Sequence, residues 1–135
     1  MKQEDTKQRI LEKALELFSN RGYDAVSVGE IASAVGIKAA SLYNHYSGKQ
    51  AIFDAIVEKS VERYEKFAES MDVHLKNVER DTGVFASIDA DTLADKVRAI
   101  FLYTLHDETV GRFRRMMSIE QFRSPDLAQL YSERY

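Results

Sequence analysis

The sequence contains no cysteine, a single proline and only six glycines among its 135 residues. Without cysteine, the chain can form neither a disulfide nor a thiolate metal site. The scarcity of helix-breaking residues, together with an apolar content of 44%, favours a soluble, globular and helical protein. The length allows one domain, or a small domain with part of a second.

Long hydrophobic stretches are also missing. The longest apolar run, Ala99–Leu102 with Tyr103 joined to it, is far shorter than the roughly 20 residues that a membrane span needs. The N-terminal segment MKQEDTKQR has no hydrophobic region of the kind found in secretory signals. We therefore expect no membrane partner and predict a cytoplasmic location.

The formal net charge is −3, which by itself argues against a nucleic-acid partner. The distribution is uneven, however. Residues 1–50 hold seven Lys or Arg against six Asp or Glu, whereas residues 51–135 hold twelve against sixteen. Since the acidity lies mainly in the second segment, a local basic edge in the first segment is compatible with DNA.

Helical periodicity begins near the N-terminus. Apolar residues recur over Asp5–Arg21 with the spacing of a one-sided helix, which Gly22 is expected to end in a left-handed conformation. Ser27 and Glu30 then form an S-x-x-E capping box, which predicts a short second helix over Val28–Val35.

Two further helices are predicted next. The first runs over about Lys38–Tyr46, after Gly36 has ended the preceding helix. Ser47 and Gln50 repeat the capping pattern and predict a long fourth helix, whose apolar residues keep helical spacing as far as Met71.

The remaining sequence predicts helices and no strand. The expected elements are a loop over Glu79–Ala90, a fifth helix through Leu93–Leu105, a sixth from Val110 toward Phe122, and a seventh that opens at Ser124-Pro125. The predicted fold is all-α, with a domain over residues 1–50 joined by the long fourth helix to a helical domain over residues 51–135.

The second and third predicted helices have the pattern of a helix-turn-helix. Ala32 is small enough for a steep helix crossing, and Gly36 suits the turn between the helices. Ile31, Val35 and Leu42 would pack the pair against the first helix. In such a unit the second helix of the pair can enter the major groove of DNA.

One face of the third predicted helix suits a DNA groove. With Leu42 and Tyr46 packed inward, a step of about 100° per residue places Ala40 and Asn44 on the opposite side. The small Ala39 and Ala40 side chains would allow close approach to the bases. Asn44 can pair with a base edge, for which adenine is the best geometric match.

Polar and basic residues surround this face. Lys38 stands at the helix entrance, Ser41 lies beside the face, and Tyr43 and His45 carry donors that could hold the DNA backbone. Lys49 lies at the start of the fourth helix, where unpaired N–H groups and the helix dipole favour a phosphate. Taken singly, the lysines could be ordinary solvated charges, and Tyr43 and Tyr46 could be core aromatics.

The block from Ile10 to Ile56, about a third of the chain, resembles the DNA-binding domain of the TetR family of transcriptional regulators. Its motif is Ser/Thr-Leu-Tyr-x-His-aromatic with a downstream lysine, which this chain reads as SLYNHYSGK. The resemblance implies phosphate or groove contacts for Ser27, Ser41, Tyr43, His45 and Lys49, and sequence reading by Lys38, Ala39, Ala40 and Asn44. The family usually has glycine at position 40 and often a basic residue or proline at position 39, whereas this chain has alanine at both. The operator sequence therefore cannot be inferred from other members of the family.

The resemblance also implies a function. Members of the family are ligand-responsive transcriptional regulators, mostly repressors, that bind a near-palindromic double-stranded DNA operator as homodimers. Their later helices hold a small-molecule effector and build the dimer interface, and they usually extend beyond the length of this chain. We therefore expect the sequence to be a fragment whose regulatory domain is incomplete.

Residues of the second half could line an apolar effector pocket with a few polar groups. The candidates are Phe67, Met71, Phe101, Thr104, His106, Phe113 and Met117. Core packing is the stronger explanation for nearly all of them, because an apolar stripe at helical spacing needs no ligand, so the pocket is expected only through the resemblance. The three histidines lie on separate predicted elements without suitable partners, so neither catalysis, a metal nor a cofactor is expected. The alternative function is that of a non-catalytic, all-helical protein-protein interaction module.

Overall fold

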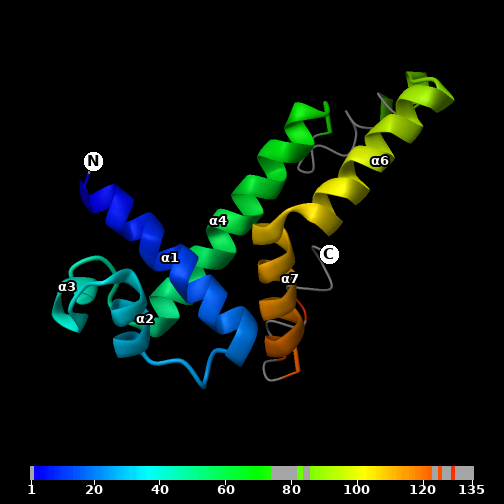
Figure 1. Cartoon of the computed structure of the whole chain (residues 1–135). Coiled ribbons are helices and arrows are strands. Elements are labelled where there is room, and N and C mark those ends of the chain that lie inside the picture. Colours follow the sequence, from blue (N-terminus) through cyan, green and yellow to red (C-terminus); the bar gives the residue numbers. More distant parts are fainter. Residues whose placement is uncertain (1, 74–81, 84–85, 123–124, 126–128, 130–135) are drawn as a thin grey trace. The chain divides into compact units, whose positions relative to one another are not determined.

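The computed structural model describes residues 2–73, 82–83, 86–122, 125 and 129. Across these ranges the chain forms helices and no strand, which confirms the predicted all-α fold (Figure 1). The helices are α1 (Lys2–Arg21), α2 (Val28–Val35), α3 (Ala39–Tyr43), α4 (Lys49–Ser70), α6 (Ala90–His106) and α7 (Glu108–Glu120). Of the helix predicted after Ser124, the described residues include only Pro125 and Gln129, which are both helical.

The chain packs as two compact units. The first comprises residues 1–57 with residues 112–135, and the second comprises residues 58–111. The division falls within α4 and again within α7, so the second half of α7 belongs to the first unit. The predicted domain boundary at residue 50 stays a prediction. None of the helices in the described ranges is long and apolar enough to cross a membrane.

Helices α1 and α2 end as their sequences predict. Gly22 has a φ of 82°, and its N–H donates to the carbonyl of Phe18 over 2.9 Å. At α2, the Ser27 hydroxyl accepts from the Glu30 N–H over 3.1 Å, while the Glu30 carboxylate accepts from the Ser27 N–H over 2.8 Å. Gly36 follows the helix with a φ of 83°. The capping box and the bounds of α2 are confirmed.

Helix α3 is shorter than predicted. It ends at Tyr43 because the next N–H groups bond three residues back, from Asn44 to the Ser41 carbonyl and from His45 to the Leu42 carbonyl. Such bonds tighten the chain into a 3₁₀-like turn and stop the α-helix. Tyr46 nevertheless packs against the core, as its spacing from Leu42 predicted.

Helix α4 begins at Lys49, one residue later than a Ser47 cap would require. The carbonyl of Gly48 accepts the first helical bond, from the Ile52 N–H over 3.2 Å. The Gln50 side chain donates to Asp54 over 2.9 Å.

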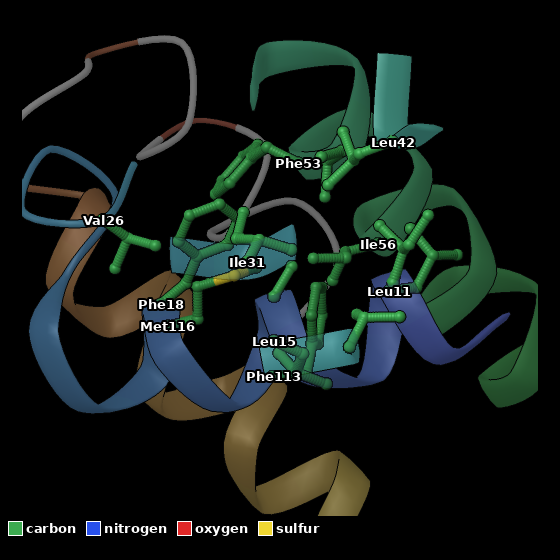
Figure 2. Packing of buried hydrophobic residues seen from close by; sticks show 14 of the residues in the cluster. Leu11, Leu15, Phe18, Val26, Ile31, Leu42, Phe53, Ile56, Phe113 and Met116 are labelled. Carbon is green, nitrogen blue, oxygen red and sulfur yellow. The ribbon is translucent and has the colours of Figure 1, made fainter. Parts of the chain in front are cut away.

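The first unit has one closed hydrophobic core, which Figure 2 shows from close by. Side chains from α1, α2, α3, the start of α4 and the second half of α7 meet in it. Its fully or almost fully buried members include Ile10, Ala14, Phe18, Val26, Ile31, Leu42, Ile52, Met116 and Met117. The aromatic ring of Phe18 lies 5.4 Å from that of Tyr23 and 6.2 Å from that of Phe53.

The second unit contains the rest of α4, α6 and the first residues of α7. The rings of Phe67 and Tyr103 stack at 3.9 Å, and the Arg63 guanidinium lies 2.9 Å from the Asp107 carboxylate. Asp89 caps the start of α6, where its carboxylate accepts from the Thr92 N–H over 2.8 Å. The loop predicted over Glu79–Ala90 is wrong in part, because residues 82–83 and 86–87 are helical and α6 already begins at Ala90.

Candidate nucleic-acid interface

The predicted groove face of α3 lies on the surface. The residues predicted to form this face or to surround it are all exposed, namely Lys38 and Asn44 at the two ends of α3 and Ala39, Ala40, Ser41 and Tyr43 within it. The Tyr43 side chain is 53% exposed, whereas Leu42 between Ser41 and Tyr43 is completely buried. Leu42 therefore fixes the rotation of α3 and turns the polar face outward. The contacts of this face with DNA stay a prediction.

The scaffold beneath α3 is tied to α1. The Arg9 guanidinium donates to the carbonyl of Val35 over 2.6 Å, at the last residue of α2. This bond satisfies a carbonyl at the helix end that has no partner within the helix. Together with the left-handed Gly36 it fixes the direction in which the chain leaves α2 toward α3.

Ser27 is exposed at the start of α2, where it is part of the cap. The partner in this cap, Glu30, also accepts from the Arg21 guanidinium over 2.8 Å. The pKa of Glu30 is lowered, first by the backbone N–H of Ser27 and then by the hydrogen bond from Arg21. The capping role of Ser27 is thus confirmed, and a phosphate contact by its side chain stays a prediction.

Lys49 has a role that sequence reasoning missed. Its ammonium donates to the carbonyl of Tyr23 over 2.9 Å and lies 4.1 Å from the centre of the Tyr23 ring. Neither a carbonyl nor a phenol ring carries a net charge, so the lysine is fixed in place without being neutralised. A phosphate role for Lys49 is compatible with this geometry and stays a prediction.

Tyr23 is the second residue that sequence reasoning missed. Its N–H donates to the Glu120 carboxylate over 2.9 Å, and its hydroxyl donates to the Gln50 side-chain oxygen over 3.2 Å. Its ring meets that of Phe53 edge-on at 5.4 Å. Burial raises the pKa of Tyr23, and the nearby carboxylates of Asp24, Asp54 and Glu120 raise it further. No local pattern signals these contacts, because the partners are distant in the sequence.

The two remaining aromatic residues of the motif are less exposed. His45 is half-buried where α3 gives way to α4. Tyr46 is also half-buried, with the Lys7 ammonium 5.6 Å from its ring centre, and burial raises its pKa. The placement of Tyr46 agrees with the core role predicted for it.

The residues predicted to line an effector pocket fall into different units. Phe113 and Met117 are buried in the core of the first unit. The other five, Phe67, Met71, Phe101, Thr104 and His106, belong to the second unit. The Phe101 side chain is 61% exposed, and Phe67 is half-buried against Tyr103. The structure does not gather this set within one unit, and the pocket stays a prediction.

Comparisons with known proteins agree with this geometry. Residues 10–56 match the family described as bacterial regulatory proteins, tetR family. The biofilm operon icaADBC HTH-type negative transcriptional regulator IcaR of Staphylococcus epidermidis is 44% identical over 52 residues, and the same regulator of Staphylococcus aureus strain Newman is 42% identical over 52 residues. Each match covers 38% of this chain and 28% of the relative.

Two solved structures share the fold. A Mesorhizobium loti protein assigned to the TetR family of transcriptional regulators aligns with 99% of this chain at a TM-score of 0.66 and 21% identity. A TetR-family transcription regulator from Marinobacter aquaeolei aligns with 99% at a TM-score of 0.56 and 21% identity. The chain spans 62% and 65% of these two proteins.

The matched segment coincides with the described geometry. Residues 10–56 run from the first buried residue of α1 through α2 and α3 to the buried start of α4. The matched family is one of transcription regulators, a class without catalytic activity. Through this segment the chain is similar to the tetR family of bacterial regulatory proteins.

Proposed function

We propose that this chain is the DNA-binding part of a ligand-responsive transcriptional repressor, together with a portion of its regulatory domain. The observation that carries the proposal is the face of α3, where Ala40, Ser41, Tyr43 and Asn44 are exposed while Leu42 is buried. Small residues at its centre permit close approach to base edges, and the asparagine offers paired donor and acceptor atoms. Lys38 and Lys49 supply positive charge at the ends of this segment.

Repression is the favoured outcome, because the curated relatives quoted above are negative regulators. A homodimer would place two copies of α3 about one DNA turn apart, in adjacent major grooves of a near-palindromic operator. A small-molecule effector would favour a state in which the separation of the two α3 helices no longer matches adjacent major grooves. Coupling of this kind typically amounts to about 1–3 kcal/mol, or roughly a 5- to 150-fold change in operator affinity. A cytoplasmic location follows from the same proposal.

The proposal is tested by selecting bound duplexes from a random pool and measuring two substitutions on the selected site and on random DNA. Asn44→Ala should cost about 1–3 kcal/mol on the selected site and little on random duplex, because it removes a base contact. Lys38→Ala should weaken binding to both and reduce the slope of log affinity against log salt by about one, because it removes a phosphate contact.

Lys38 is a better probe of phosphate contact than Lys49. Its side chain is exposed, whereas that of Lys49 also holds Tyr23 inside the first unit. The proposal is overturned if no duplex is enriched by the selection. Base reading by α3 is overturned if Asn44→Ala weakens the selected site and random DNA equally.

A further inference from the structure

Tyr23 is held at three polar atoms by side chains from two helices, all within the first unit. Glu120 at the end of α7 accepts from its N–H, Lys49 at the start of α4 donates to its carbonyl, and Gln50 accepts from its hydroxyl. These bonds fix the peptide groups on both sides of the Tyr23 Cα as well as its ring. A residue in the turn after α1 thus links the end of α7 to the beginning of α4.

The hydrogen bond that Glu120 accepts is unusual. Its side chain is only 5% exposed, although glutamate is rarely buried, and it reaches a backbone N–H 97 residues away in the sequence. A buried polar group that loses its hydrogen-bond partner is costly, which favours keeping this bond. Glu120 therefore acts as a fixed anchor for the Gly22–Tyr23 peptide.

The position of the Lys49 side chain depends on Tyr23, which this anchor holds in place. A free lysine side chain samples many rotamers and loses that freedom when it meets a phosphate. Docked on the Tyr23 carbonyl and ring, the Lys49 ammonium is already confined. Because both acceptors are uncharged, its positive charge remains available to DNA.

We propose that Glu120 is a positioning residue for DNA binding, which acts by holding Tyr23 as the platform on which Lys49 docks. This inference rests on the proposed function and deepens it, because it assigns a route of regulation to the same site. A shift of the α7 end that draws Glu120 away from Tyr23 would release the platform and loosen Lys49. Movement of α7 caused by an effector would then lower the affinity for DNA without changing the structure of α3.

The test is a double-substitution cycle in the full chain, with affinity for random-sequence duplex measured by fluorescence anisotropy at fixed low salt. Glu120→Ala alone should weaken binding about tenfold, within the range measured for coupled residues. This direction is diagnostic, because removing a negative charge from a DNA-binding protein should otherwise strengthen binding. In the Lys49→Ala background, Glu120→Ala should change the affinity by less than about twofold.

Two further variants separate positioning from folding. Glu120→Gln keeps an acceptor for the Tyr23 N–H and should bind DNA like the native chain. Glu120→Asp keeps the charge but shortens the reach by one carbon, and it should weaken binding only when Lys49 is present. If Glu120→Ala does not fold, the comparison of Glu120→Gln with Glu120→Asp replaces it. Thermal unfolding, followed by circular dichroism, shows whether each variant is folded.

Two outcomes overturn the inference. The first is a loss of DNA affinity from Glu120→Ala that is the same in the native chain and in the Lys49→Ala background. If the alanine variant does not fold, the same comparison is made with Glu120→Asp. The other is a loss in Glu120→Gln as large as that in Glu120→Asp. If the native chain binds no duplex at low salt, the proposed function itself fails. If it binds but the cycle is additive, only the positioning role fails.

Discussion

The two units of the chain differ in how they use their apolar residues. In the first unit, side chains from five helices close over a single core, and the exposed face of α3 is mostly small or polar. In the second unit, α6 buries no residue completely. Its exposed large apolar residues are Leu93, Val97, Phe101, Leu102 and Leu105.

This difference shows which surfaces are informative. Where the core is closed, the residues left outside are not needed for packing, which leaves the polar cluster on α3 available for the proposed contact with DNA. In the second unit, Phe67 of α4 stacks on Tyr103 of α6, and Asp89 caps the start of α6. Burial stabilises by about 25 cal/mol per Å² of apolar area, so α6 gains less stability than α1.

The largest expected effect contrasts two phenylalanines. Phe18 is fully buried and Phe101 is 61% exposed. Phe18→Ala should lower the free energy of unfolding by about 3–5 kcal/mol, because it removes buried area and leaves a cavity. Phe101→Ala should change it by no more than about 0.5 kcal/mol. Urea unfolding of both variants measures the difference, and equal losses would contradict the contrast between the units.

Alanine substitutions at two glycines should change the stability in opposite directions. Gly36 has a φ of 83° and open space around its Cα, so Gly36→Ala should destabilise by about 1–2 kcal/mol through backbone strain alone. Gly111 lies within α7, also with open space, and Gly111→Ala should stabilise by about 0.5–1 kcal/mol. Thermal unfolding checks both signs. A stabilising Gly36→Ala would show that the turn before α3 does not require its left-handed residue.

Much of the fold was predictable from the sequence because its signals are local. The bounds of α2 depend on a capping serine, a glutamate three residues later and a glycine after the last turn. The end of α3 was not predicted correctly, because hydrogen bonds three residues back compete with helical ones and periodicity does not distinguish them. The second half of α7 joins the core of the first unit through long-range packing, which no local pattern encodes.

The candidate site shows the same division. The outward face of α3 followed from Leu42, since one buried residue in a helix sets the direction of its neighbours. The contacts of Lys49 and Glu120 with Tyr23 could not be predicted, because folding chooses their partner from residues far along the chain. The sequence thus indicated the surface offered to DNA better than the supports behind it.

The last comparison concerns the helix caps, one in each unit. Ser27→Ala should lower the free energy of unfolding by about 1 kcal/mol, because the Glu30 N–H loses its acceptor. The pKa of Glu30 should remain lowered in this variant, since its largest cause is the backbone N–H of residue 27, which alanine retains. A carbon-detected pH titration by NMR measures that pKa directly.

Asp89 gives the counterpart in the second unit. Its pKa is lowered first by the Thr92 N–H and then by the Thr92 hydroxyl. A carboxylate whose pKa is lower in the folded state stabilises the fold above its unfolded pKa, near 3.8 for Asp89, and this contribution disappears as the pH falls through the folded value. Asp89→Asn keeps a good cap without a titrating group, so amide exchange at Thr92 should lose its acid-dependent increase in opening. The same amide in the native chain should open more readily as the solution is acidified over this range, and an unchanged acid response in Asp89→Asn would exclude this carboxylate as its cause.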